Sequence, residues 1–194
     1  MYGLSQLWSD LGADIARSGA KSADFNAPSA SLVRRTGTLL TPSLLSILIY
    51  RHSHWLHQKG CFRLGALLAR LNLMVHRIQI DPAVRIGPGL YIPHTVGVIL
   101  ECNAGRNLTV YAAALAPRRG CSPPSGELDR PEIGDDVTIG AYAIVDGPHR
   151  IGNDVRISPQ AVVTVSIPPG RVVVTSLLLS RSASIRSISA AFFE

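Results

Sequence analysis

The stretch IDPAVRIGPGLYIPHTVGVILECN, residues 80–103, divides into four units of six residues, and each unit begins with Ile or Val. The same period returns in IGDDVTIGAYAIVDGPHRIGNDVRISPQAVVTVSIP, residues 133–168. The aliphatic residue points inward, and the Gly, Asp, Pro or Ser that often follows suits a bend. Three units make one triangular coil, and stacked coils bury a continuous aliphatic column. A β-sandwich would not hold this period, so we predict a mainly β protein, a left-handed parallel β-helix of hexapeptide repeats.

The period is disturbed once in its first half. Between VILECN at residue 98 and LTVYAA at residue 108 only AGRN intervenes, four residues where six are expected. ALAPRR at residue 114 follows with Ala in the first place, and a Pro/Ser/Gly stretch comes next. We therefore expect this coil to be tightened or broken.

The N-terminal third has a helical period instead. Apolar residues over positions 4–18 recur with the spacing of an amphipathic helix, and residues 20–38, rich in Ser, Ala, Arg and Gly, resemble a loop. Thr41-Pro42 is a favourable helix start, and the apolar run after it ends at Lys59-Gly60. A further helix is predicted over residues 61–76.

These patterns predict three regions in the chain. Residues 1–76 form an α-helical segment, and residues 77–173 form the β-helix with an extruded loop at about 119–131. Residues 174–194 are a C-terminal tail of mixed apolar and basic character.

The composition is that of a globular, basic protein. Hydrophobic residues make up 46% of the 194 residues, and 19 Lys and Arg against 13 Asp and Glu give a formal net charge of +6. The Arg residues form no run or stripe, which argues against a nucleic-acid partner. Attraction for an anionic ligand such as a CoA phosphate, or a merely basic surface, remain as readings of the charge.

Cysteine usage and hydropathy bear on the compartment. The three cysteines Cys61, Cys102 and Cys121 have no CxxC or Cys/His ligand spacing, which fits a reducing cytoplasm and argues against a metal site. The N-terminus lacks the pattern of a secretory signal. The longest apolar stretch, residues 43–50, is about a third of a membrane span, so no membrane insertion is expected.

Four segments resemble one family. They are ILIYRHSHWLHQKG (47–60), IDPAVRIGPGLYIPHTVGV (80–98), LDRPEIGDDVTIGAYAIV (128–145) and SIPPG (166–170). Over residues of about 43–173 the chain is similar to the serine acetyltransferase branch of the hexapeptide-repeat acyltransferases. The resemblance implies a homotrimer with active sites between neighbouring β-helices, acetyl-CoA as donor and a small-molecule hydroxyl group as acceptor.

The resemblance also assigns a base. An alcohol attacks a thioester only as its proton is removed, and His94 in IPHTVG matches the catalytic His of the family. Such a base works best when a second group orients it. The family has an acidic residue at the position of Gln79, and Asp81, two residues on, points to the same side of a strand. Asp81 is either a substitute for that acid or a turn residue before Pro82.

The substrate positions depart from the family pattern. Pro93 stands where serine acetyltransferases have an acid, and Asp129-Arg130-Pro131 lacks the family's second His, although Arg130 could bind a carboxylate or phosphate. We therefore expect an acceptor other than free serine, such as a sugar or a specialised metabolite. Donor-binding candidates by resemblance are Gly140, Ala141 and Tyr142, together with Arg118 and Arg119 for the CoA phosphates.

Two functional hypotheses follow from these residues. The first is a cytoplasmic CoA-dependent O-acyltransferase, specifically an O-acetyltransferase, with His94 as its base and Asp81 or Gln79 as its orienting group. The second is a catalytically inactive paralogue that acts as a scaffold or regulatory partner, which Gln79, the missing second His and the disturbed coil favour.

Overall fold

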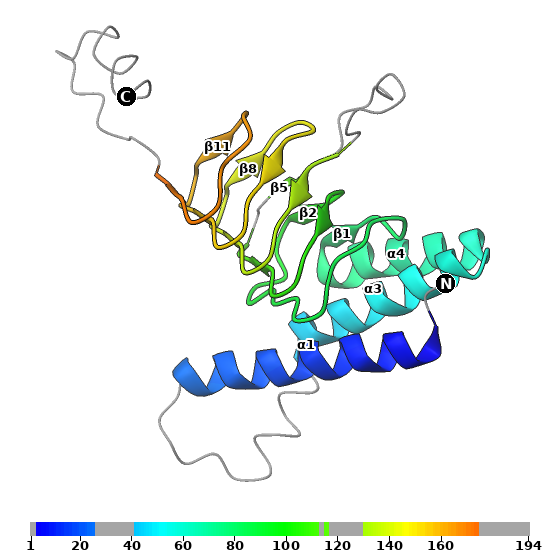
Figure 1. Ribbon diagram of the computed structural model, residues 1–194. Coiled ribbons are helices and arrows are strands. Elements are labelled where there is room, and N and C mark those ends of the chain that lie inside the picture. The colour runs from blue at the N-terminus through cyan, green and yellow to red at the C-terminus, as the bar shows by residue number, and fades with distance from the viewer. Residues whose placement is uncertain (1–2, 26–40, 113–114, 117–129, 175–194) are drawn as a thin grey trace, which may run out of the picture.

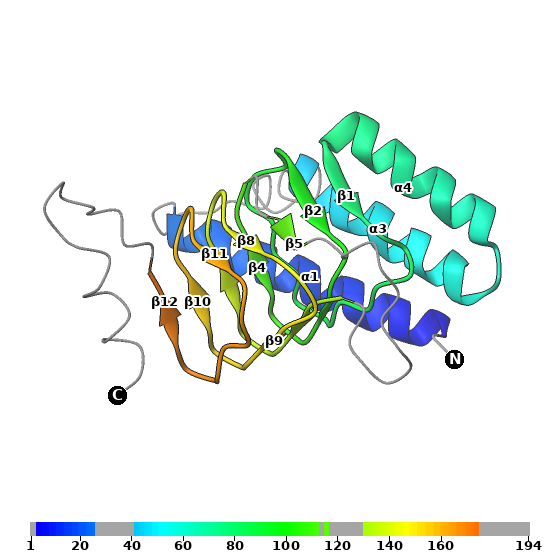
Figure 2. The same cartoon turned by 90° about the horizontal axis from the view of Figure 1, so that it is seen from above.

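The computed structural model describes residues 3–25, 41–112, 115–116 and 130–174. Three helices precede a three-sided parallel β-helix: α1 (Leu4–Phe25), α3 (Pro42–Gln58) and α4 (Phe62–His76). Helices α3 and α4 pack together at the first-coil end of the β-helix, and α1 runs along its length, beneath it in Figure 1 and again overlapping it in Figure 2. Within the described residues, no helix combines the length and apolar character needed to cross a lipid bilayer.

The strands form three parallel sheets, one for each side of the prism. Face 1 has the order β1-β2-β5-β8-β11, face 2 the order β3-β6-β9, and face 3 the order β4-β7-β10-β12. The strands are β1 (Ile78–Ile80), β2 (Val98–Leu100), β3 (Asn103–Ala104), β4 (Thr109–Val110), β5 (Leu115–Ala116), β6 (Glu132–Ile133), β7 (Thr138–Ile139), β8 (Ile144–Val145), β9 (Arg150–Ile151), β10 (Arg156–Ile157), β11 (Val162–Val163) and β12 (Val172–Val173). The predicted left-handed β-helix is confirmed.

The core is a column of aliphatic side chains inside the prism. Its members are first and fifth residues of the hexapeptides, as in Ile86 with Leu90 and Ile139 with Ala143, all of them buried, whereas Val96, the fifth residue of IPHTVG, is 58% exposed. Val84 is buried because it is a fifth residue, and the pattern of first residues alone did not predict that it points inward. Each buried CH₂ group contributes about 0.8 kcal/mol, so this repeated pair is the main source of stability in the β-helix.

The disturbed coil is tightened at one corner and remains continuous. Ile80 pairs with Leu100, and Ile86 pairs with Ala104, so only four positions separate the first residues on faces 1 and 2 of the second coil. The turn before it is longer by the same amount, because Leu100 lies eight positions after Ile92. The predicted frame with Leu108 in first place is wrong: Ala104 and Val110 occupy the first positions, and Leu108 is an inward fifth residue.

The helices begin and end close to their predicted positions, with one exception. Thr41 caps α3, since its side chain accepts a hydrogen bond from the backbone N–H of Leu44 at 3.4 Å. Helix α1 continues to Phe25, so the predicted loop over residues 20–38 is wrong for its first part, and residues 26–40 lie outside the described residues. The extension GAKSADF contains the good helix formers Ala20, Lys21 and Ala23, which continue the helix along the side of the prism.

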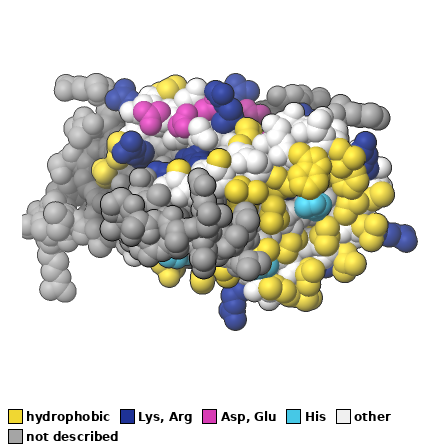
Figure 3. All heavy atoms as spheres, turned by 90° about the horizontal axis from the view of Figure 1, so that it is seen from below, with side chains coloured by type: hydrophobic (Ala, Val, Ile, Leu, Met, Phe, Trp, Pro, Cys, Tyr) yellow, Lys and Arg dark blue, Asp and Glu magenta, His cyan; other side chains and the backbone are white. Residues whose placement is uncertain are grey.

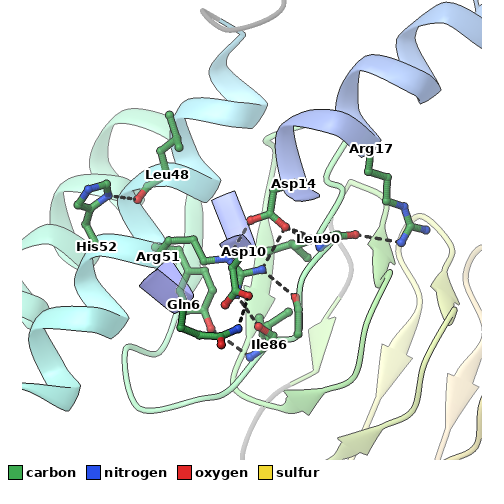
Figure 4. A network of polar contacts seen from close by, with 12 residues as sticks. Gln6, Asp10, Asp14, Arg17, Leu48, Arg51, His52, Ile86 and Leu90 are labelled. Atoms are coloured by element: carbon green, nitrogen blue, oxygen red, sulfur yellow. Dashed lines mark hydrogen bonds and ion pairs between the residues drawn. The ribbon is translucent and has the colours of Figure 1, made fainter. Parts of the chain in front are cut away.

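A buried ion pair fastens α1 and α3 to the first coil (Figure 4). The Arg51 guanidinium donates to both Asp14 carboxylate oxygens, at 2.8 and 3.1 Å, and to the carbonyl oxygens of Ile86 and Gly87 at 2.5 and 2.7 Å. Asp14 also accepts hydrogen bonds at 2.8 Å from the backbone N–H groups of Gly89 and Leu90. The side chains of Arg51 and Asp14 are 1% and 0% exposed. Both charges are therefore paired and hydrogen-bonded away from water.

Helix α3 makes two further polar contacts with the first coil. The Tyr50 hydroxyl donates to the Val84 carbonyl at 3.0 Å and accepts from the Ile86 N–H at 3.2 Å. His54 Nδ1 lies 2.8 Å from the carbonyl oxygen of Pro82. Burial lowers the pKa of His54, so the neutral ring donates Nδ1–H to that carbonyl. The first coil is thus held by side chains of the preceding helix.

Exposed apolar side chains gather at the helical end of the molecule. Figure 3 shows hydrophobic side chains over much of that end, with Lys and Arg side chains at its margin, whereas the acidic side chains in view lie along the β-helix. The large exposed residues there are Leu4, Trp8, Phe62, Leu64, Leu67, Leu71, Leu73, Met74 and Val75. A contiguous apolar surface of this kind is typical of a contact with another protein chain.

The buried ion pair gives the first prediction. Replacing Asp14→Ala should lower the free energy of unfolding by about 3–5 kcal/mol, because Arg51 and two backbone N–H groups lose their partner inside the protein. Urea denaturation followed by circular dichroism measures this loss. Glu132→Gln is the control, because its partner Arg150 lies at 3.3 Å with both side chains largely exposed, and the loss there should stay below about 1 kcal/mol. Equal losses in the two variants would contradict an anchoring role for Asp14.

Candidate active site

His94 lies in the long turn between faces 3 and 1 of the first coil. Ile92, immediately before the turn, is buried in the core, and the Ser43 hydroxyl of α3 donates to its carbonyl oxygen. At the other end of the turn the Gly97 N–H donates to the Arg77 carbonyl at 3.2 Å, and Gly97 has a positive φ of 69° that suits glycine. The turn is therefore held at both ends, while the His94 side chain is exposed.

No hydrogen bond or ion pair to the His94 ring occurs within residues 3–25, 41–112 and 130–174. The predicted orienting groups, Gln79 and Asp81, are both on the outer side of the β-helix, but neither contacts His94 in the single chain. The Gly97–Arg77 hydrogen bond places the His94 turn beside the start of β1, two residues before Gln79. His94 and Gln79 therefore belong to the same side of the molecule.

Gln79 is paired with a carboxylate that the sequence reasoning missed. Ile78 and Ile80 are buried, so Gln79 between them faces outward, and its Nε2 donates to Glu101 Oε1 at 2.9 Å. Glu101 follows β2 on the next coil. The alternation of buried and half-buried residues from Val98 to Cys102 could have placed Glu101 on the outer face. Only the strand register shows that it meets Gln79.

Asp81 and Arg130 form a second polar group at the edge between faces 1 and 2. Asp81 Oδ1 accepts the backbone N–H of Ala83 at 2.9 Å, and its Oδ2 lies 3.8 Å from Arg130 Nη1. The carboxylate of Asp81 thus closes the turn at Pro82 and also holds Arg130. Next to this group, burial raises the pKa of the Cys102 thiol to about 12, so Cys102 is protonated and is no nucleophile.

Gly140, Ala141 and Tyr142 form the turn after β7, on the same edge as the His94 turn. The Tyr142 N–H donates to the Ala112 carbonyl at 3.0 Å, and Ala141 accepts from the Gln160 N–H at 2.9 Å. Turns of successive coils therefore stack along this edge, each about 4.8 Å from the next. The Tyr142 side chain is 62% exposed there. These residues line one continuous edge with His94.

Gly140 is explained by the stacking itself. A Cβ atom at this position would lie 2.5 Å from the Pro159 nitrogen and 2.7 Å from the Ile157 carbonyl oxygen, and the Gly140 N–H donates to that oxygen at 2.8 Å. Its backbone is hydrogen-bonded to the neighbouring coil, so of the three predicted donor-binding residues in this turn Ala141 and Tyr142 are the ones presented at the surface.

The other predicted site residues fall outside the described part of the chain. They are Arg118, Arg119 and Asp129, with most of the predicted extruded loop and the tail from residue 175. Two surface grooves lie away from His94. One of about 830 Å³ is on face 2, between Arg85 and Arg150, and one of about 580 Å³ is between α1 and face 3. Within the described residues, no group of three or more His, Cys, Asp or Glu could hold a metal ion.

Comparison with known proteins gives consistent matches. A family model described as "Bacterial transferase hexapeptide (six repeats)" matches residues 130–164. A serine acetyltransferase of Mycobacterium tuberculosis is 35% identical over 135 residues, which cover 69% of this chain and 58% of the relative. One of Helicobacter pylori strain J99 is 34% identical over 134 residues, covering 68% of this chain and 77% of the relative. The chain thus spans little more than half of the first relative.

Solved structures agree. The crystal structure of a Neisseria gonorrhoeae serine acetyltransferase matches with a TM-score of 0.74 and 25% identity, over 97% of this chain and 72% of the other. A soybean serine acetyltransferase complexed with serine matches with a TM-score of 0.75 and 25% identity, over 88% of this chain and 68% of the other.

The role of Gly140 can be tested with a second glycine as reference. Gly140→Ala should lower the free energy of unfolding by about 1–3 kcal/mol, because the added methyl group meets backbone atoms of the next coil. Gly12→Ala in α1, where a Cβ meets nothing within 4 Å, should raise it by about 0.5–1 kcal/mol. Thermal and urea denaturation of both variants provide the comparison. A Gly140→Ala variant as stable as the parent would refute the stacking explanation.

Proposed function

The chain belongs to the serine acetyltransferase family of hexapeptide-repeat proteins, and on that basis we propose that it is an acetyl-CoA-dependent O-acetyltransferase acting on a hydroxyl acceptor. The observation that carries the proposal is the His94 turn, which is anchored at both ends and presents an exposed imidazole on an edge of the β-helix. An imidazole is the usual base for activating a hydroxyl near neutral pH.

The reaction proceeds by direct transfer. The His94 ring takes the proton of the acceptor hydroxyl as its oxygen attacks the thioester carbonyl carbon. The tetrahedral intermediate then collapses, the carbon–sulfur bond breaks, and the leaving CoA thiolate takes the proton from the imidazolium. Backbone N–H groups beside the extruded loop stabilise the oxyanion in this proposal.

Gln79 is the better candidate for orienting His94. The Asp81 carboxylate is engaged by the Ala83 N–H and by Arg130, on the far edge of face 1. Gln79 lies on the side of face 1 to which the Gly97–Arg77 hydrogen bond brings the His94 turn. Asp81 then serves the site indirectly by holding Arg130, which is proposed to bind an anionic group of the acceptor, while Asp129 is proposed to bind a hydroxyl or amino group of it.

The donor is proposed to lie along the edge that carries His94, Ala141 and Tyr142. Two coil spacings, about 10 Å, separate the His94 turn from the Tyr142 turn along the axis. An extended pantetheine arm fits such an edge, with the thioester at His94 and the nucleotide end farther along. Arg118 and Arg119 are proposed partners of the CoA phosphates.

The site is proposed to be completed by a neighbouring chain in a homotrimer. His94 and Arg130 lie on different edges of the prism, so one chain presents the base and another chain the acceptor-binding Arg130. The apolar helical end supports association, because a surface of that kind is seldom left in water.

The acceptor is proposed to be serine or a serine-like compound. The two relatives named above are serine acetyltransferases, which supports serine as the acceptor. Pro93 and Pro131 depart from the family pattern and support another hydroxyl compound, such as a sugar or a specialised metabolite. An acceptor screen therefore begins with L-serine and continues with amino sugars. The scaffold alternative rests on one observation, that the neutral Gln79 stands at the position of the family's acid.

Removing the base is the decisive test of the enzyme proposal. His94→Ala should lower kcat by about 10²–10⁴-fold, because the acceptor proton loses its base, while calorimetric binding of acetyl-CoA is retained. Thiol release from acetyl-CoA measures turnover. His52→Ala, an exposed histidine on α3 whose Nδ1 lies 2.8 Å from the Leu48 carbonyl oxygen, is the matched control and should leave turnover unchanged. A protein that binds no acetyl-CoA at near-millimolar concentration would favour the scaffold.

A further inference from the structure

Glu101 is a carboxylate to which the sequence assigned no role. Gln79 pairs with Ile99 in the register of β1 and β2, and Glu101 follows two positions later on the same outer side of face 1. The Gln79 amide reaches across this diagonal, so that its Nε2 lies 2.9 Å from Glu101 Oε1. Both side chains are half-buried.

This contact determines which end of the amide is available. A carboxylate only accepts hydrogen bonds, so the NH₂ end of Gln79 must face Glu101, and its carbonyl oxygen Oε1 must face the other way. A free glutamine in water presents either end. Here Glu101 fixes the NH₂ end of the amide, and the His94 turn returns to face 1 beside Arg77, two residues before Gln79.

We propose that Glu101 is a positioning residue of the active site: it holds the Gln79 amide with Oε1 toward the His94 ring, where Oε1 accepts an imidazole N–H, and its negative charge supports the imidazolium through that amide. The inference rests on the proposed function for its catalytic consequence. In this arrangement the Glu101 carboxylate acts on the His94 ring indirectly, because the Gln79 amide lies between them. The ring nitrogen that Gln79 leaves free is the one that takes the acceptor proton.

Several charged and titratable groups of the described residues lie near Glu101. On β1 and its flanks these are Arg77 and Asp81, and the neighbouring Cys102 thiol is buried and protonated. Arg130 comes from the start of the segment leading to β6, where Asp81 holds it. The last residue of α4 is His76, whose Nδ1 contacts Asn72 Oδ1 at 3.1 Å. Among these described neighbours, only Glu101 hydrogen bonds with Gln79.

A charge exchange between the two positions tests the inference. Glu101→Gln removes the charge, and the double variant Gln79→Glu with Glu101→Gln moves it to the position next to the ring while keeping an amide–carboxylate pair. Glu132→Gln on face 2 is the matched control, since it removes the same charge from a different face. The measurements are kcat, KM, the pH profile of kcat/KM, and the NMR titration of the His94 ring, assigned with His94→Ala.

We expect Glu101→Gln to lower kcat about tenfold and to move the acidic limb of the pH profile and the NMR titration of the His94 ring to lower pH, because the imidazolium loses support. KM for acetyl-CoA and the thermal midpoint should stay unchanged. The double variant should restore kcat and the titration of the His94 ring, and Glu132→Gln should alter neither of these two quantities.

Two outcomes would overturn the inference. One is a Glu101→Gln variant with the parent's kcat and the parent's His94 titration. The other is equal loss in the single and double variants together with a lower thermal midpoint, which would show a purely structural role. Because the NMR titration needs no turnover, it separates the two proposals: an inactive parent whose His94 titration still responds to Glu101→Gln would refute the enzyme function and leave the positioning contact standing.

Discussion

The close stacking of the coils is the constraint on which this structure depends. Backbone hydrogen bonds join each coil to the next, and at several corners the backbones of neighbouring coils approach so closely that only glycine fits. A Cβ at Gly87 would lie 2.6 Å from the Gly105 carbonyl oxygen, and one at Gly152 would lie 2.5 Å from the Pro169 nitrogen. Because the first coil has no coil before it, its polar groups must find partners elsewhere. Helices α1 and α3 supply them through Asp14, Arg51 and Tyr50.

This dependence gives the helices a part in the site. The same helix α3 that holds the first coil through Arg51 also holds the carbonyl of Ile92 through Ser43, directly before the His94 turn. The position of the imidazole is therefore set by a rigid helix and a stacked strand. A site built on such elements is more precise than one on a free loop. The helical segment is thus part of the framework that positions the turn of the proposed base.

Much of the fold could be predicted from the sequence, because each six-residue unit forms one side of a coil. The predicted first position at Leu108 was wrong because both Leu108 and Val110 point inward. An aliphatic residue at either position satisfies the six-residue pattern, and only strand pairing distinguishes them. His94 could be predicted by its place in a motif and lies at an exposed turn. The Gln79–Glu101 contact and the Asp14–Arg51 pair could not, because they join residues 22 and 37 positions apart whose meeting depends on register and helix docking.

The turn that carries His94 has a counterpart one corner later. The two positions added between Ile92 and Leu100 are removed again between Leu100 and Ala104, so Val110 stands three hexapeptides after Ile92, its counterpart on face 3. Long turn and short corner together span twelve positions. The same short corner recurs between Val163 and Ile167 without a long turn before it, because Val145, Ile151, Ile157 and Val163 follow one another at six positions. A corner of this prism can therefore change its length while the strands on either side keep their register, so a graft of the His94 turn needs only the two strands that it joins.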